Sequence, residues 1–334
     1  MKYIVTGGYG FIGSHLVKKL VNGKHSVINL DKESYSSMPE SLKDLKKNNL
    51  LNNIKVDINN YKKIKKIFYL FKPDAIIHLA AESHVDNSIK SPKVFIDSNI
   101  CGTYNLLEIT REYLNKIKKN KFVFLHVSTD EVYGSLEKKS DISFTEDNKY
   151  LPNSPYSASK ASSDLLVRAW NKTFSIPTII TNCCNNYGPW QYPEKLIPVI
   201  IYKCLMRKKI PIYGKGTNIR EWIHVDDHVS SLLEILKKGK RGESYNIGSG
   251  YEINNIDLTY KICNVLDELI PYKHSYSKLI NFVKDRAGHD FRYAINSNKL
   301  IKELKFKIKS NFDHNLRSTV IWYLNNIDWL KSKL

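Results

Sequence analysis

Two side chains four residues apart could together remove a proton from a hydroxyl group. Tyr156 and Lys160 begin and end the segment Tyr-Ser-Ala-Ser-Lys, whose spacing places both on one face of a helix. A nearby ammonium favours the phenolate form of a tyrosine and lowers its pKa from the usual value of about 10. Tyr156 is therefore a candidate base for a reaction in which a hydroxyl loses its proton while a hydride leaves the adjacent carbon. Without further support, the same spacing is more often an ordinary pair on a helix surface.

A hydroxyl and two consecutive carboxylates, Thr129, Asp130 and Glu131, follow an apolar run that ends at Val127. If that run is a strand of a doubly wound sheet, its carboxyl end is where such folds bind ligands. One carboxyl could then act as an acid and its neighbour as a base. Thr and Asp are also frequent caps at the start of a helix, which is the structural alternative. In this position we favour chemistry.

A glycine-rich turn, Thr6-Gly7-Gly8-Tyr9-Gly10-Phe11-Ile12-Gly13, separates the first apolar run from the first helical segment. Glycines allow a tight turn and the close approach of a pyrophosphate, which the amides at a helix N-terminus can bind. Asp31 comes 18 residues after Gly13 at the end of the next apolar run. A carboxylate there accepts bonds from both ribose hydroxyls and repels a 2′-phosphate, whereas the structural alternative is a capping Asp. In this order the residues predict a dinucleotide site that prefers NAD over NADP.

The elements that must position these residues alternate along the first 180 residues. Short apolar runs are interleaved with amphipathic segments, which predicts a parallel sheet with helices on both faces. The expected strands are 2–6, 26–30, 75–79, 122–127 and 178–181, and the expected helices are 11–21, 61–71, 99–117 and 157–173.

Past residue 182 the elements become shorter and turns more frequent. We therefore expect an α/β chain in two domains. Residues 1–182 would form a Rossmann-type doubly wound parallel sheet, and residues 183–334 a smaller mixed α/β domain that binds the substrate. A segment near 221–247 is expected to return to the sheet, and the lysine-rich stretch 36–55 is expected to lie on the surface.

Composition excludes several classes of protein. The chain has 334 residues, of which 42% are hydrophobic, and contains no apolar run of the roughly 18 residues that span a bilayer. It starts directly with a strand-like segment, with no basic and apolar leader. The five cysteines form no Cys-x-x-Cys pair, so neither a disulfide framework nor a metal site is indicated. We expect a cytoplasmic protein without membrane contact.

The net charge of +19 raises the question of a nucleic-acid partner. Of the 52 basic residues only eight are Arg, and the Lys residues are dispersed through helical segments rather than gathered in one patch. We interpret them as solvated surface side chains and expect no nucleic-acid partner; an anionic partner is the alternative.

Six motifs in order resemble those of the extended short-chain dehydrogenases/reductases, and among them the dTDP-glucose 4,6-dehydratases. They are T-G-G-x-G-F-I-G-S, H-L-A-A-E-S-H-V-D, S-T-D-E-V-Y-G, S-P-Y-S-A-S-K-A-S-S-D, N-N-Y-G-P and P-E-K-L-I-P, and they extend over nearly the whole chain. The Thr129–Asp130–Glu131 triplet is the specific element, since related epimerases share the glycine turn and the Tyr/Lys pair but lack the acidic couple.

The resemblance implies a three-stage reaction without net redox change. Tyr156 would take the C4 hydroxyl proton of dTDP-glucose while hydride passes to NAD, and Thr129 would hold that hydroxyl. Glu131 would remove the C5 proton, which the C4 ketone acidifies, while Asp130 protonates the departing C6 hydroxyl. Hydride return to C6 gives dTDP-4-keto-6-deoxyglucose. The product would enter deoxysugar biosynthesis, with dTDP-rhamnose as the expected pathway.

The family's ligand contacts carry over to matching positions of this chain. For several of them a plain structural role is the alternative: Asp57 could end a strand, His84 start a helix and Lys195 be solvated. The cofactor contacts implied are Gly7, Gly10, Phe11, Ile12, Gly13, Asp31, Lys32, Ser34, Asp57, Ile58, Leu79, Ala80, Ala81, Ser83, Ser98, Tyr156, Lys160 and Asn186. The sugar-nucleotide contacts implied are Ser83, His84, Thr129, Asn185, Lys195, Leu196, Pro211, Tyr213, Arg220, Asn255, Arg286 and His289.

Two arginines in a chain that otherwise uses Lys suggest that a planar, bidentate fork for phosphate is needed at Arg220 and Arg286. The segment around Arg286 has Ala287 where the dTDP-linked enzymes usually have Pro. Its Gly288-His289 pair still resembles them, because UDP-linked relatives tend to have Phe-Asn there. Long helices over 93–117 and 158–170 resemble those that pair in this family and imply a homodimer, although apolar residues at helical spacing could equally be core.

Three alternatives stay open. A UDP-glucose 4,6-dehydratase would differ in its nucleotide, and a sugar-nucleotide 4-epimerase would not need Asp130 and Glu131. A non-catalytic, NAD-sensing regulator would not need Tyr156 or Lys160 and would gather its basic residues into a patch.

Overall fold

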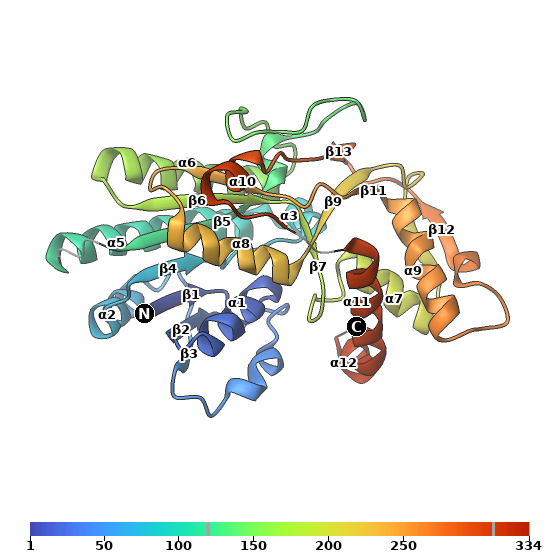
Figure 1. Cartoon of the computed structure of the whole chain (residues 1–334), viewed down its shortest axis with the longest axis horizontal. Coiled ribbons are helices and arrows are strands. Elements are labelled where there is room, and N and C mark those ends of the chain that lie inside the picture. Colours follow the sequence, from blue (N-terminus) through green and yellow to red (C-terminus); the bar gives the residue numbers. More distant parts are fainter. Residues whose placement is uncertain (118–120, 309–310, 334) are drawn as a thin grey trace.

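The computed structural model describes residues 1–117, 121–308 and 311–333. Its centre is a seven-stranded, wholly parallel sheet (Figure 1). In sheet order the strands are β10 (Ser244–Ile247), β6 (Thr178–Cys183), β5 (Val123–Thr129), β4 (Ala75–His78), β1 (Lys2–Thr6), β2 (Ser26–Asp31) and β3 (Leu51–Lys55). This order is that of a doubly wound dinucleotide-binding fold with one strand added, so the expected fold class is confirmed.

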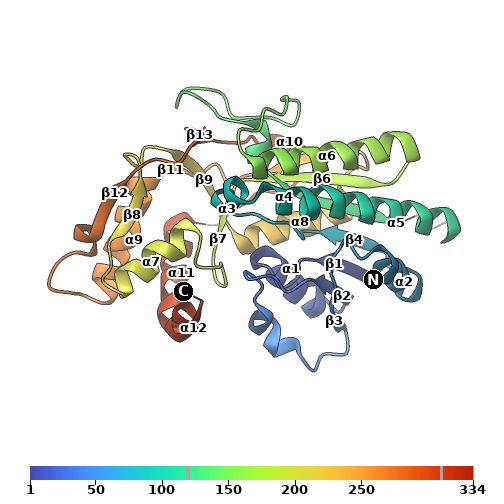
Figure 2. The same ribbon diagram turned by 180° about the vertical axis from the view of Figure 1, so that it is seen from behind.

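Helices cover both faces of this sheet (Figure 1; Figure 2). α1 (Phe11–Asn22) and α8 (Val225–Lys238) pack on one face, where Leu16 and Leu232 belong to one buried cluster. α2 (Tyr61–Phe71), α5 (Gly102–Ile117) and α6 (Pro155–Phe174) pack on the other face, where Phe68 and Leu106 belong to a second buried cluster. The apolar strands are thus buried on both faces, as parallel strands normally are.

The second domain has a core of its own. It contains the helices α7 (Leu196–Leu205), α9 (Asn255–Leu269), α11 (Phe312–Asn325) and α12 (Ile327–Ser332), and the 3-10 helix η4 (Tyr276–Leu279). β9 (Ile219–His224) pairs with β7 (Asn185–Tyr187), β11 (Glu252–Asn254) and β13 (Arg292–Tyr293), and β8 (Ile210–Tyr213) pairs with β12 (Ile280–Val283). Its helices lie at the other end of the molecule from α2 and α5 (Figure 2).

Two segments connect the second half of the chain back to the large sheet. In the expected returning segment near 221–247, α8 and β10 pack with the large sheet, whereas Glu221 to His224 belong to β9 of the smaller one. The sequence did not point to α10 (Asn298–Leu304), which buries Leu300 and Leu304 in the core of the large sheet.

Two local expectations need correction. Residues 93–117 do not form one regular helix, because α4 (Pro92–Phe95) leads into a π-helical segment, η2 (Ile96–Cys101), before α5 begins. The stretch 36–55 is only partly surface, since it contains the 3-10 helix η1 (Pro39–Leu45), in which Leu42 is buried, and the edge strand β3. The remaining short helices are α3 (Val85–Lys90) and η3 (Asp130–Tyr133). No helix in the described ranges is long and apolar enough to cross a membrane.

Gly7 provides a test of the first turn. Its φ is +74°, and a Cβ there would lie 2.8 Å from the backbone N of Ala80. We expect Gly7→Ala to lower the free energy of unfolding, measured by urea denaturation, by more than the roughly 1–2 kcal/mol that a left-handed conformation costs. Gly250 is the matched control, because its φ is +79° but a Cβ there would meet open space. Equal losses in the two variants would contradict a steric role for Gly7.

Candidate active site

A cavity of about 520 Å³ lies between the two domains. One wall of the cavity is the edge of the large sheet at which its strands end. The strand register shows this, because Thr6 pairs with His78, His78 with His126, and Thr129 with Cys183. The carboxyl ends of β1, β4, β5 and β6 therefore lie along one edge of the sheet, where ligands of such folds bind. Residues of α7, β8, β9 and the segment after β12 line the opposite wall.

The glycine turn forms one end of this cavity. The Gly10 amide donates to Gly7 O at 3.0 Å, and the first helical bond of α1 runs from the Ser14 amide to Gly10 O at 2.9 Å. The amides of Phe11, Ile12 and Gly13 precede that bond and belong to residues that line the cavity. A Cβ at Gly13 would lie 2.1 Å from Gly7 O, so the turn is too tight for a side chain. Such a cradle at a helix N-terminus fits a pyrophosphate.

Asp31 lies beside the turn at the end of β2 and is almost fully buried. Its Oδ2 accepts from the Tyr9 amide at 3.0 Å, and its Oδ1 accepts from the Glu33 amide at 2.8 Å and from Ser37 Oγ at 2.9 Å. These donors fix the carboxylate at the position where a ribose-binding acid of this fold stands.

The structure places the expected ligand contacts in two groups. All twelve expected sugar-nucleotide contacts line the cavity, as do the expected cofactor contacts Gly7, Gly10, Phe11, Ile12, Gly13, Leu79, Ala81, Ser83, Tyr156, Lys160 and Asn186. The other expected cofactor contacts lie outside its lining: Asp31, Lys32, Ser34, Asp57, Ile58, Ala80 and Ser98.

The candidate catalytic residues come from β5, η3 and α6. Thr129 ends β5 and caps η3, since its Oγ1 accepts from the Glu131 amide at 3.3 Å and donates to Asp130 Oδ1 at 3.3 Å. Tyr156 and Lys160 occupy successive turns of α6, and both are buried. Lys160 Nζ donates to the carbonyl of Val127 at 2.9 Å. The cavity thus brings together all five residues that the sequence proposed for catalysis.

The two adjacent carboxyls differ in their surroundings. Burial raises the pKa of Asp130 well above its ordinary value, and the nearby carboxylates of Glu131 and Glu221 raise it further. Burial also raises the pKa of Glu131, but the cations Arg220 and Lys195 oppose that shift. Asp130 is therefore the member suited to be a protonated acid, and Glu131 the member suited to be the base.

The pKa of Tyr156 differs from the expectation. Burial raises it well above 10, and the carboxylate of Glu131 adds to this, while the Thr129 hydroxyl lowers it. The expected lowering by Lys160 is outweighed because the phenol is desolvated and faces an acid. Burial lowers the pKa of Lys160 itself, and the carboxylate of Asp164 opposes that change.

The two arginines lie on the wall opposite the sheet. Arg220 donates to the carbonyls of Ile219 at 2.7 Å and Asp290 at 2.9 Å, and its guanidinium stacks 4.3 Å from the ring centroid of Tyr293. Arg286 holds Asp86 in a bidentate pair, with Nε to Oδ1 at 2.6 Å and a terminal nitrogen to Oδ2 at 3.1 Å. Its fork is therefore formed and oriented at the cavity.

Several lining residues were not singled out from the sequence: Asp86, Cys183, Trp222, Asp290 and Tyr293. Asp86 belongs to the motif H-L-A-A-E-S-H-V-D, and Cys183 comes two residues after the end of the last expected strand, so their positions in the sequence could have pointed to both. Trp222 and Tyr293 reach the cavity through β9 and β13, which sequence periodicity does not place.

Comparison with known proteins gives a consistent result. Residues 4–319 match the family model described as GDP-mannose 4,6 dehydratase. The dTDP-glucose 4,6-dehydratase of Salmonella typhimurium is 49% identical, over 99% of this chain and 95% of that protein. Crystal structures of dTDP-glucose 4,6-dehydratases from Bacillus anthracis in complex with NAD, and from Streptomyces venezuelae with NAD and TYD bound, are each 39% identical. Their TM-scores are 0.89 and 0.92, with full coverage of both chains.

The raised pKa of Asp130 predicts a measurable effect on stability. A carboxyl whose pKa is higher in the folded state than in the unfolded state makes the stability of the protein depend on pH. The free energy of unfolding falls as pH rises from the unfolded pKa, about 4, toward the folded pKa. We expect Asp130→Asn to raise the free energy of unfolding at pH 7–8 by about 1–3 kcal/mol, with the gain vanishing near pH 4. Urea denaturation at several pH values measures this, with the exposed Asp147→Asn as the control. A gain that does not change with pH would refute the assignment of Asp130 as the protonated acid.

Proposed function

This chain belongs to the dTDP-glucose 4,6-dehydratase family, and we propose that it converts dTDP-glucose into dTDP-4-keto-6-deoxyglucose and water, with NAD as cofactor. The observation that carries the proposal is the acidic couple Asp130 and Glu131, which shares one cavity with Tyr156 and Lys160. An epimerase has no use for an acid and a base at C5 and C6, and a regulator has no use for a base at C4.

NAD fits the end of the cavity at the glycine turn. The N-terminal amides of α1 would hold its pyrophosphate, Asp31 its adenosine ribose, and Tyr156 and Lys160 its nicotinamide ribose. When bound, NAD accepts a hydride from C4 of the sugar and later returns it to C6.

The first proton transfer falls to Tyr156. Its phenol would hydrogen-bond the C4 hydroxyl and take that proton, with Thr129 Oγ1 holding the same oxygen. The Lys160 ammonium, fixed by the carbonyl of Val127, stabilises the phenolate that this requires. Because the phenol is buried beside Glu131, its deprotonation depends on that ammonium and on the positive charge of the bound cofactor.

The elimination falls to the adjacent carboxyls. With a ketone at C4, the C5 hydrogen is acidic and Glu131 would remove it. Asp130, kept protonated by burial, would give its proton to the C6 hydroxyl, which leaves as water. Each carboxyl thus changes its protonation state once in this step, and the pair's total charge is unchanged.

The nucleotide is held on the opposite wall. The forked guanidinium of Arg286 and the buried guanidinium of Arg220 suit a diphosphate. The Gly288-His289 pair supports thymine rather than uracil, and the dTDP-linked enzymes named above point the same way. Such a product serves deoxysugar biosynthesis, for which we propose the dTDP-rhamnose branch.

We also propose a homodimer in the cytoplasm. α4, α5 and α6 lie side by side on the outer face of the sheet (Figure 2), and with η2 they expose Val94, Ile96, Tyr104 and Leu165 there. An apolar helical face of this kind suits pairing with a second copy, and light scattering of the purified protein tests it. The five cysteines are free, as suits a reducing compartment.

Incubation of the purified protein with dTDP-glucose tests the activity directly. We expect a product lighter by one water, by mass spectrometry, without added NAD if the cofactor stays bound during purification. UDP-glucose in parallel tests the nucleotide and is expected to react far more slowly. A product of unchanged mass but inverted C4 would instead identify an epimerase. No reaction with either substrate, even with NAD supplied, would favour the alternative of a non-catalytic, NAD-sensing regulator.

Glu131→Gln separates the two halves of the reaction. Loss of the C5 base should lower the rate of water loss about 10²- to 10⁴-fold, while C4 oxidation continues because Tyr156 is intact. Reduced nicotinamide should therefore accumulate on adding dTDP-glucose, as seen by its near-ultraviolet absorbance. Tyr156→Phe, the matched control, should show no such absorbance. Unchanged turnover of Glu131→Gln would exclude it as the base.

A further inference from the structure

A buried acid lies behind the Tyr156–Lys160 pair. Asp164 follows Lys160 by one turn of α6 and is 1% exposed, yet it lies outside the lining of the cavity. A carboxyl this deeply buried is rare unless it is paired or functional. No step of the dehydration uses it directly, since it can contact neither the sugar nor the cofactor.

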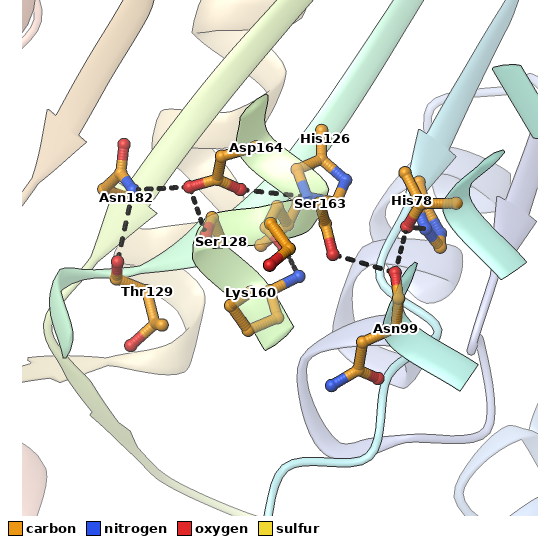
Figure 3. A network of polar contacts seen from close by, with 12 residues as sticks. His78, Asn99, His126, Ser128, Thr129, Lys160, Ser163, Asp164 and Asn182 are labelled. Carbon is orange, nitrogen blue, oxygen red and sulfur yellow. Dashed lines mark hydrogen bonds and ion pairs between the residues drawn. The ribbon is translucent and has the colours of Figure 1, made fainter. Parts of the chain in front are cut away.

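Two side chains of the neighbouring strands donate hydrogen bonds to this carboxyl, and a third side chain lies close to it (Figure 3). Ser128 Oγ donates to Asp164 Oδ2 at 2.8 Å, and Asn182 Nδ2 approaches the same oxygen at 3.3 Å. His126 Nε2 lies 3.1 Å from the other oxygen, Oδ1. Asn182 also donates to the carbonyl of Thr129 at 3.1 Å. Asp164 is thereby fixed to the ends of β5 and β6, next to Thr129.

The charge state of Asp164 suits a partner for an ammonium. Burial raises its pKa to about 6, against the lowering effects of the Lys160 ammonium and of hydrogen bonds from Ser128, Tyr150 and Asn182. The carboxyl is therefore ionised at pH 7 and above. On Lys160, burial lowers the pKa, and Asp164 is the largest influence that opposes it, ahead of Cys183.

The other titratable groups around the pair carry no charge at neutral pH. His78 and His126 have a pKa well below 6.5 because they are buried, and burial raises the pKa of Tyr133, Tyr150 and Cys183. Asp130 and Glu131 lie on the cavity side, around Tyr156. Among the described residues, Asp164 thus provides the fixed negative charge on the sheet side of Lys160.

We propose that Asp164 is a positioning residue for this reaction, which holds the Lys160 ammonium protonated against the carbonyl of Val127 and so keeps Tyr156 effective as the base. The inference rests on the proposed function and adds a residue to its machinery. i,i+4 spacing on α6 brings the two charges to one face of the helix, and β5 and β6 prevent the carboxylate from turning away. Without that negative charge, burial would lower the pKa of Lys160 further.

Asp164→Asn removes the charge and keeps the shape. With a dTDP-linked 6-deoxyglucose, which has no C6 leaving group, the reaction is limited to C4 oxidation and can be followed by nicotinamide absorbance. We expect a rate lower by roughly 10- to 100-fold, less than the loss of a base itself, with KM within about twofold. Because Lys160 then loses its proton at lower pH, the alkaline limb of the rate profile should move to lower pH. The control Asp147→Asn should change neither the rate nor the position of the alkaline limb.

A Lys160→Met background distinguishes positioning from a merely structural role. If Asp164 acts through the ammonium, Asp164→Asn should cost less than about twofold there. An equal loss in both backgrounds, or an Asp164→Asn enzyme with an unshifted alkaline limb, would overturn the proposal.

If Asp164→Asn is too unstable for an activity assay, the melting temperatures of this variant and of the double variant with Lys160→Met still test the proposal. The double variant should melt at a higher temperature than Asp164→Asn, because it contains no buried ammonium that lacks a negative charge nearby. A double variant that melts no higher would overturn the proposal. Inactivity of the wild-type protein on dTDP-glucose would refute the proposed function itself, a result distinct from these outcomes.

Discussion

Burial of ionisable side chains at the carboxyl edge of the sheet is the constraint on which the rest of the site depends. β1 and β4 end level with each other there, β5 and β6 run three residues further, and α6 packs across these two longer strands, so water is excluded from the groups between them. The same desolvation raises the pKa of Asp130, Glu131 and Tyr156 and lowers that of Lys160. In water both carboxyls would be ionised at neutral pH, and neither could serve as an acid.

Charged groups of the second domain make the two neighbouring carboxyls differ in how far their pKa values are raised. The cations that limit the shift of Glu131 are Arg220 on β9, Lys195 at the start of α7 and Arg286 after β12, all from beyond the large sheet. Asp130 lies deeper, against Glu131 and Glu221, where anions add to burial. The difference between the surroundings of Asp130 and Glu131 therefore depends on groups from both sides of the cavity.

The sequence predicts those elements whose formation depends on local patterns of apolar and polar residues. Alternation of apolar runs and amphipathic segments predicted the large sheet, and the 61–71 helix was predicted residue for residue. It gave no bounds for β3, an edge strand in which Asn52, Asn53 and Lys55 are exposed. It also did not point to α10, whose two buried leucines belong to the core of the large sheet. The five candidate catalytic residues were found because they share short motifs. Asp164 belongs to one of those motifs, but its hydrogen bonds come from Ser128 and Asn182, which only the fold brings beside it.

The arginines show what composition can and cannot indicate. In a chain this rich in lysine, an arginine is expected where a planar guanidinium is needed, and three arginines agree. Arg292 pairs in bidentate fashion with Glu252, Arg111 with Glu108, and Arg207 stacks 4.1 Å from the ring centroid of Tyr272. Those three lie outside the cavity and serve the fold. The residue type therefore predicts a geometry, whereas only position distinguishes Arg220 and Arg286, which present that geometry to a cavity. Carboxylate and phosphate present the same pair of acceptor oxygens to a guanidinium. Asp86 therefore accepts the two Arg286 hydrogen bonds for which two oxygens of a diphosphate would compete.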